Sequence, residues 1–277
     1  MRARLGIRVA VILAFALATM AEVAQAQAHV TIRAAVLRVD APRPLPLSRL
    51  DLPAEDDGFA GGRVATADNS TTGQFLGHAY ETEEVEATPE TAGEALDRLV
   101  ADGTGFVVVV APSETLLALA DRVAEQEVIL FNAAATDDRL RNDDCRSNVF
   151  HTAPSRAMLA DGVAQYLVWK KWTDWLLVHG SHPADQAKAE AYRRAAARFG
   201  AEIAGELIFE DTGGARVSDS GHVLAQRQIP VFTQRAEEHD VVVVADDSEV
   251  FGAYIPYRTW EPRPVAGDAG LVARTWH

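Results

Sequence analysis

Residues 105–156 contain two apolar runs separated by an amphipathic segment, a pattern typical of a strand–helix–strand unit. The first run, at 106–111, is continuous rather than alternating, which predicts a parallel strand buried on both faces. The second run, at 128–131, predicts a shorter buried strand. Between them the apolar residues recur at helical spacing: Leu116, Leu117, Leu119, Ala120, Val123 and Ala124. Because parallel strands end at the same edge of a sheet, we expect the loops at 111–113 and 132–136 to lie side by side, where open α/β folds bind ligands.

These two loops carry hydroxyl side chains that suit a ligand site. Ser113 stands where the helix is expected to begin, and serine is a common N-cap residue. A helix N-terminus also holds anions, since its unpaired N–H groups and its dipole favour negative charge. Ser113 and Thr136 are therefore each either a structural residue or a ligand contact.

Strand and helix patterns alternate along the rest of the chain. Before the unit we expect strands at 29–39 and 79–87, a helix that ends near 68–72 with Gly73 in a turn, and a helix from 88 to 100. After it we expect, in order, a helix capped by Ser155, a strand at 175–178, a loop at 179–183, a helix at 184–199, a strand at 203–209, a poorly patterned helix at 223–235 and a buried strand at 241–245. This alternation predicts a parallel sheet in each half of the chain.

The same patterns predict the fold class and the domains. We expect an α/β protein with two Rossmann-like lobes, each built on a parallel sheet, and a ligand site in the cleft between them. The N-terminal lobe would occupy residues 27–152 and the C-terminal lobe residues 153–277, with the chain crossing between them near 150–154. A chain of 277 residues is long enough for each lobe to bury its own core.

The N-terminal residues predict the cellular location of the protein. Three arginines precede an apolar run at 9–20, and small residues follow at 24–28. This pattern predicts a secretory signal peptide at 1–26, because the run is too short to span a bilayer comfortably. No cysteine that could be lipidated follows the run directly. We therefore expect a periplasmic protein that is not inserted in the membrane once the signal peptide is cleaved.

The net charge and the single cysteine exclude several classes of protein. The formal net charge of −14 opposes binding to nucleic acids or to anionic membranes, since both carry negative charge. Cys145 is the only cysteine, so no disulfide can form within the chain. We expect its thiol to be structural and partly buried, since no neighbouring base marks it as catalytic.

Residues 137–144 are rich in aspartate and allow two interpretations. Asp137, Asp138, Asp143 and Asp144 offer oxygen ligands for a hard cation, but the spacing of a calcium loop is absent. Arginines lie among and after them, at 139, 141 and 146, which favours a solvated loop of ion pairs. We expect neither a bound metal nor a cofactor.

A catalytic alternative rests on a loop in the second half of the chain. Ser181 with His179 or His182 could supply the nucleophile and the base of an exported α/β hydrolase, but no Gly-x-Ser-x-Gly turn accompanies them. We expect both histidines to be ordinary loop residues. Asp246 and Asp247 follow a later buried strand, where we expect a solvated turn that faces the cleft.

Three short segments carry a family resemblance: Val-Ile-Leu-Phe at 128–131, Ala-Ala-Thr at 134–136 followed by Leu140, and Phe-His-Thr-Ala at 150–153. They resemble the type I periplasmic binding proteins that serve ABC importers, in the branch similar to leucine/isoleucine/valine-binding proteins. The resemblance extends from about His29 to the end of the chain.

A narrower resemblance rests on residues 68–73, Asp-Asn-Ser-Thr-Thr-Gly, and residues 75–77, Phe-Leu-Gly. These segments resemble the binding proteins associated with pyrroloquinoline-quinone-dependent alcohol catabolism. The family resemblance implies a monomer that is not an enzyme and that captures a small polar solute, either branched-chain amino acid-like or related to alcohol catabolism. It implies that an ABC permease and its ATPase receive the solute. An alternative is a periplasmic sensor of the same fold, which would signal to a membrane receptor.

The resemblance also implies a set of ligand-binding residues. In the amino-acid binders of the family, a serine, backbone groups and an Ala-x-Thr arrangement hold the ligand carboxylate, which implies Ser113, Ala134 and Thr136 here. A carboxylate late in the second lobe meets the ligand ammonium, which implies Asp268. His151 stands where the family usually has an arginine at the crossing, and it is the fifth candidate.

The chain departs from that branch in two further respects. The tyrosine usual after the second-lobe strand is replaced by the region around Pro183 and Ala184. Members of the family usually continue with strands and helices that return to the first lobe, so we expect this C-terminal return segment to be missing. The ligands of other family members therefore do not identify the ligand of this chain.

Overall fold

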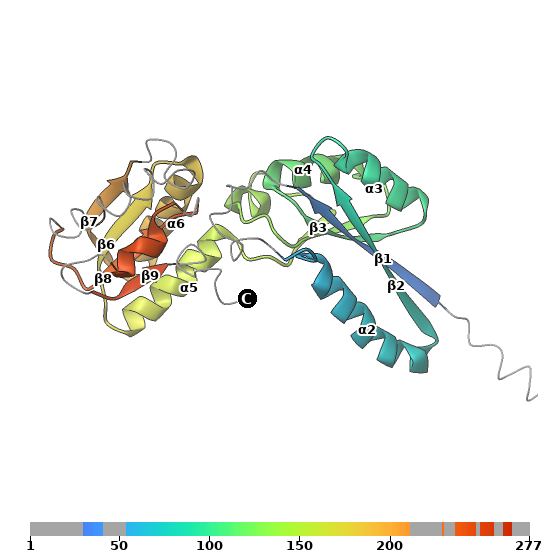
Figure 1. Cartoon of the computed structure of the whole chain (residues 1–277), viewed down its shortest axis with the longest axis horizontal. Helices are drawn as coiled ribbons and strands as arrows, with labels where there is room; N and C mark the ends of the chain where they lie inside the picture. The colour runs from blue at the N-terminus through green and yellow to red at the C-terminus, as the bar shows by residue number, and fades with distance from the viewer. Residues whose placement is uncertain are drawn as a thin grey trace, which may run out of the picture.

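The computed structural model describes residues 30–40, 54–210, 229, 236–247, 250–257 and 263–267. Within these ranges the chain is an α/β protein with two separate sheets of parallel strands (Figure 1). The predicted fold class, with a parallel sheet in each half of the chain, is therefore confirmed. Among the described residues, no helix combines enough length with enough apolar character to cross a bilayer.

The first sheet has five strands in the order β2-β1-β3-β4-β5. These strands are β1 (Val30–Val39), β2 (His78–Ala87), β3 (Phe106–Val110), β4 (Ile129–Asn132) and β5 (Val149–His151). The helices are α2 (Phe59–Leu76), α3 (Ala92–Ala101), α4 (Ser113–Arg122) and the short 3-10 helix η2 (Asp138–Arg141). The sequence did not predict β5, which pairs with β4 and makes the crossing segment the edge strand of this sheet.

The second sheet has four described strands in the order β7-β6-β8-β9. They are β6 (Asp174–Gly180), β7 (Glu202–Phe209), β8 (Val241–Ala245) and β9 (Val265–Gly267). The helices are α5 (Arg156–Trp169), α6 (Pro183–Phe199) and the 3-10 helix η3 (Gly252–Tyr257). The chain passes from the first sheet to the second between β5 and α5. The helix expected at 223–235 lies largely outside the described residues.

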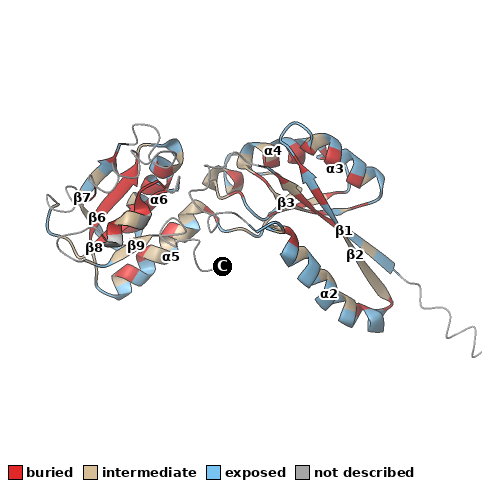
Figure 2. Cartoon of the chain, viewed as in Figure 1, coloured by how far each residue is buried: buried red, intermediate tan, exposed pale blue. Residues whose placement is uncertain are grey.

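The core of the first sheet lies between the sheet and helices α3 and α4 (Figure 2). Val107 and Val109 of β3 are fully buried in it, whereas Phe106 is 43% exposed. The expectation that residues 106–111 form a strand buried on both faces is therefore wrong. The physical reason is that α2, the helix on the other face, packs mainly on β1 and β2 and covers β3 only in part.

The second sheet is covered on both faces. Helices α5 and α6 pack on one face, and Phe251 and Ile255 lie in the cluster on the other. All residues of β8 are buried as a result. The continuous apolar run at 241–245 therefore predicted a doubly covered strand correctly.

Helix α2 continues beyond its expected end near residues 68–72. Gly73 lies inside the helix rather than in a turn, and a Cβ there would lie 2.8 Å from the backbone oxygen of His78 and from the Tyr80 ring. Its small size allows the helix to approach β2. The glycine that ends the helix is Gly77, whose φ of 72° is left-handed, as glycine C-caps commonly are.

Strand β6 is longer than expected and includes His179 and Gly180. Both are buried, and His179 pairs with Ile208 of β7 and Ala245 of β8. The expectation that His179 belongs to a loop is therefore wrong. The strand continues because β6 is an inner member of this sheet, so that His179 has backbone neighbours on both sides and Gly180 pairs with Phe209 of β7.

Candidate ligand-binding site

The loop that follows β4 is shaped by the side chain of Asn132, which is fully buried. Its Oδ1 atom accepts hydrogen bonds from the N–H groups of Ala134, at 3.2 Å, and Ala135, at 2.8 Å. Its Nδ2 atom donates to the Ala135 carbonyl at 2.7 Å. Asn side chains make such local bonds readily and so hold turns in place. The loop leaves Ala134 exposed and Thr136 half-buried at the carboxyl edge of the sheet.

His151, the last residue of the neighbouring strand β5, contacts the side chain that holds this loop. Its Nδ1 atom lies 3.1 Å from Asn132 Nδ2, which is a donor, and its Nε2 atom lies 3.2 Å from the Leu140 carbonyl oxygen, which is an acceptor. The neutral ring with its proton on Nε2 satisfies both contacts. Burial and the charge of Arg141 lower the pKa of His151, although the bond to Leu140 opposes them. Both ring nitrogens are therefore used within the first sheet, and a direct contact with a ligand stays a prediction.

Ser113 lies at the start of α4, but it does not cap the helix. Pro112, with an extended backbone, occupies the N-cap position, so the expected capping role of Ser113 is wrong. The Ser113 hydroxyl is instead one of the groups that lower the pKa of the nearby Asp137 carboxylate. Partial burial raises the pKa of Asp137, but hydrogen bonds from Arg156 and Ser113 and the charges of Arg156 and Arg139 outweigh it. The pKa of Asp137 consequently lies below its ordinary value.

Arg156, the first residue of α5, connects the loops of the two sheets. Its Nη1 atom donates to Asp137 Oδ1 at 2.7 Å, and its backbone N–H donates to the Thr136 carbonyl at 2.7 Å. Its Nη2 atom lies 3.7 Å from Oδ2 of Asp247, which follows β8. Lys188, a buried residue of α6, lies 2.6 Å from the other oxygen of Asp247. The carboxyl-end loops of both sheets therefore meet at Arg156.

The N-terminus of α5 is held by residues from two directions. Ser155 Oγ accepts the N–H of Met158 at 3.3 Å, which confirms the predicted cap. Asp138 Oδ1 accepts the N–H of Ala157 at 3.0 Å, and a negative side chain is favourable at this end of a helix. Together with Thr136 and Asp137, Asp138 completes a run of three residues that attaches the loop after β4 to α5.

Asp246 is not the solvated residue expected after β8. It is 2% exposed, and its carboxylate accepts the N–H groups of Val250 at 2.9 Å, Phe251 at 2.9 Å and Gly252 at 2.6 Å. Burial raises the pKa of Asp246 although these backbone bonds oppose it, and the charge of Asp185 adds to the rise. Asp246 therefore caps the segment that leads into η3.

The contacts of His179 exclude it as the base of the hydrolase alternative. Its Nδ1 atom lies 2.8 Å from the Gly180 carbonyl oxygen, and its Nε2 atom lies 2.9 Å from Oε1 of Glu206. Neither ring nitrogen is available to activate Ser181. His182 is exposed at the start of α6.

The aspartate-rich loop forms ion pairs, as predicted. Arg139 lies 2.7 Å from Asp144 and 3.8 Å from Asp137, and it also pairs with Glu114 of α4. No group of three or more metal-binding side chains occurs within the described part of the chain. Cys145 is exposed, so the expectation of a partly buried thiol is wrong.

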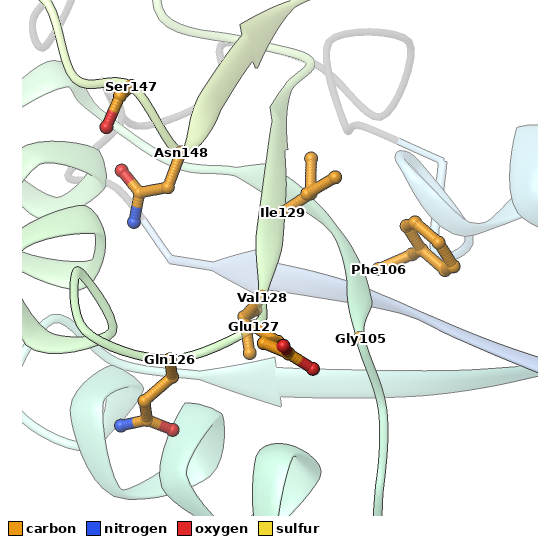
Figure 3. Close-up of a pocket in the computed structure, with 8 residues that line it drawn as sticks. All are labelled: Gly105, Phe106, Gln126, Glu127, Val128, Ile129, Ser147 and Asn148. Carbon is orange, nitrogen blue, oxygen red and sulfur yellow. The ribbon is translucent and has the colours of Figure 1, made fainter.

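A depression of about 350 Å³ lies at the opposite edge of the first sheet (Figure 3). It sits at the amino ends of β3, β4 and β5, away from the loops described above. It is lined by Gly105, Phe106, Gln126, Glu127, Val128, Ile129, Ser147 and Asn148. Its position at the amino ends separates it from the candidate site.

The structure describes the positions of four of the five candidate ligand-binding residues. Ser113, Ala134 and Thr136 lie at one edge of the first sheet, in the loops that follow β3 and β4. His151 ends β5 at the same end of the sheet, where it pairs with Asn132, and Asp268 falls outside the described residues.

Sequence comparison finds a family model described as "Periplasmic binding protein", which matches residues 60–225, well over half of the chain. No curated protein matches the chain.

Solved structures of similar fold include three binding proteins. A branched chain amino acid ABC transporter periplasmic ligand-binding protein from Burkholderia xenovorans LB400 is 17% identical, with a TM-score of 0.58 over 85% of this chain and 60% of that one. A leucine-, isoleucine-, valine-, threonine- and alanine-binding protein from Brucella ovis is 16% identical, with a TM-score of 0.61 over 86% and 60%. An ABC transporter solute binding protein from R. palustris, in complex with benzoate, is 15% identical, with a TM-score of 0.56 over 87% and 63%. The chain thus spans less than two thirds of the length of these proteins, and the likeness concerns the fold.

Proposed function

The chain belongs to the periplasmic binding protein family, and from this premise we propose that it captures a small polar solute between two lobes and presents it to an ABC permease with its ATPase. The observation that carries this proposal is the meeting of the two sets of carboxyl-end loops at Arg156. Open α/β sheets bind ligands at this edge. Binding would shift the population of lobe orientations toward a closed one.

The remaining parts of the proposal follow from the sequence. Residues 1–26 would direct export to the periplasm, and residues 27–152 and 153–277 would form the lobes of a monomer that performs no chemistry. The solute would be branched-chain amino acid-like or related to alcohol catabolism. Residues 68–73 and 75–77, which carry the resemblance to binding proteins of alcohol catabolism, lie on the exposed end of α2 and the turn after it.

Within this proposal, Ser113, Ala134 and Thr136 are the first-lobe contacts of the solute. Their shared edge and the exposure of Ala134 support this role. His151 would act mainly through Asn132, which it contacts. Asp268 is proposed from the family resemblance alone.

The test begins with mass spectrometry of the solute that co-purifies with the chain, followed by calorimetry with that solute. Thr136→Ala should weaken its binding at least tenfold, about 1.4 kcal/mol, without lowering the melting temperature, because Thr136 holds α5 through its backbone carbonyl. Thr71→Ala is the matched control, since Thr71 is exposed on α2 and its hydroxyl donates to Asp68 of the same helix. Equal affinities for the two variants would contradict the site.

Two further measurements separate the alternatives. Ligand-dependent closure in solution scattering, with no product formed, would eliminate the hydrolase. Loss of uptake on deletion supports an importer, whereas loss of a transcriptional response with uptake intact supports a sensor.

A further inference from the structure

Each long helix that begins at the meeting loops carries a negative side chain of this chain at its N-terminus. Glu114 lies in the first turn of α4, and Asp138 accepts an N–H of α5. Asp185 lies fully buried in the first turn of α6. A helix N-terminus favours one negative group through its dipole and free N–H groups. In this protein the chain itself supplies that group.

Three cations at the same loops are paired with carboxylates, whereas Arg141 of η2 donates to the Ala153 carbonyl and has a buried Nη1 atom without a hydrogen-bond partner among the described residues. Arg156 lies between Asp137, at 2.7 Å, and Asp247, at 3.7 Å. Lys188 lies 2.6 Å from Asp247, and Arg139 pairs with Asp144 at 2.7 Å. A ligand carboxylate placed beside Arg156 would therefore meet a cation that already lies between two carboxylates.

We propose that the solute carries no carboxylate, and that Asp137 is the specificity-determining residue that excludes one. The side chain of Asp137 already binds the Arg156 guanidinium at 2.7 Å, and this guanidinium is the cation that a ligand carboxylate at this edge would need. The inference rests on the proposed function, whose solute class it narrows.

Charge repulsion sets the size of the effect. Two carboxylates about 4 Å apart at an effective dielectric constant of about 20 repel enough to lower affinity by about a thousandfold. Asp137 has a side chain that is 34% exposed, so solvent and salt reduce this effect, and we expect at least a tenfold discrimination. The lowered pKa of Asp137 keeps its charge in place at neutral pH.

The test uses pairs of probes that differ in the carboxylate: L-leucine with L-leucinol, and benzoate with benzyl alcohol. Calorimetry on the whole wild-type chain should give at least tenfold weaker binding for the acid of a pair than for its alcohol. Asp137→Asn removes the repelling charge and keeps hydrogen-bonding atoms. It should therefore reduce the ratio of the alcohol's affinity to the acid's affinity at least tenfold. Asp144→Asn, which removes a carboxylate from Arg139 but none from Arg156, should leave the difference unchanged.

The outcomes separate the inference from the proposed function. A wild-type chain that binds leucine or benzoate as tightly as the matching alcohol, or that co-purifies with a carboxylic acid, overturns the inference and leaves the proposed function standing. The inference is also overturned if the Asp137→Asn variant binds neither leucine nor benzoate more tightly than the wild type does. If no probe and no co-purifying solute binds any variant, the proposed function fails and the inference fails with it. The wild-type comparison needs no variant, so poor folding of Asp137→Asn does not remove the test.

Discussion

Asn132→Ala should loosen the loop after β4, because Asn132 supplies both the acceptor and the donor that hold it. The substitution removes the acceptor for the N–H groups of Ala134 and Ala135 and the donor for the Ala135 carbonyl. Ala135 is 5% exposed, so water cannot easily replace its two lost partners, whereas the exposed Ala134 can turn to solvent. Each buried group left unpaired costs about 1 to 1.5 kcal/mol and the Ala134 group less, which gives a loss of about 3 kcal/mol.

Thermal unfolding and hydrogen exchange measure this effect together. A loss of about 3 kcal/mol corresponds to a fall in melting temperature of about 6 to 12 °C. Asn148→Ala is the matched control, since Asn148 donates to the Ala120 carbonyl at 2.9 Å and its loss should cost about 1 kcal/mol. Native hydrogen exchange localises the change, because the amides of Ala134 and Ala135 should exchange faster in Asn132→Ala and not in Asn148→Ala.

Equal melting temperatures for the Asn132 and Asn148 variants would refute this reasoning. They would mean that the groups of Ala135 find other partners once the side chain is removed. Unchanged exchange at Ala135 would refute it independently, since the loop would then be held by its own backbone. Either result would also remove the reason to expect Asn132 to support a ligand site.

The remaining predictions concern packing and pH. Gly180→Ala should destabilise the chain by about 2 kcal/mol or more, since its Cβ would lie 2.1 Å from Oδ2 of the buried Asp185, whereas Gly162→Ala in α5, where a Cβ meets nothing within 4 Å, should stabilise it by up to about 1 kcal/mol. Shifts of the same sign in urea unfolding would contradict this pair. Burial and the charge of Arg141 lower the pKa of His151 from 6.5 in the folded chain. Below that pH the unfolded chain therefore binds a proton at His151 more readily than the folded chain does. The stability that is present above pH 6.5 is consequently lost as the pH falls. His151→Gln should therefore lose less stability between about pH 7 and pH 5, and parallel losses in the two proteins would contradict the assignment.

Residues 106–110 and 241–245 show what a pattern of residue types predicts. Both are runs of 5 apolar residues, mostly valine, and both form parallel strands inside a sheet. The runs predict the strands because β-branching and period are local properties. They do not predict burial of the second face, since Phe106 is 43% exposed while every residue of β8 is buried. That difference depends on which elements pack there, and so on the whole fold.

The place of the candidate site was predictable from the sequence, while most of its contacts were not. Ser113 and Thr136 follow from the rule that parallel strands end at one edge of a sheet. An asparagine at the end of an apolar strand, before small residues, was the available signal for Asn132. Nothing local marks Arg156, because its partners Asp137 and Asp247 lie in loops of different sheets.

In the proposed function, the loop after β4 would connect solute binding to the orientation of the second sheet. Thr136 and the two aspartates that follow it bind the first two residues of α5, at distances of 2.7, 2.7 and 3.0 Å. Helix α5 in turn packs on the second sheet. A solute that contacts Thr136 therefore touches the segment that holds α5, and no further element is needed to transmit a shift of that loop. Since a ligand moves a conformational equilibrium only by its difference in affinity for the two states, a solute at Thr136 would move α5 only if it bound more tightly in one orientation of α5 than in the other.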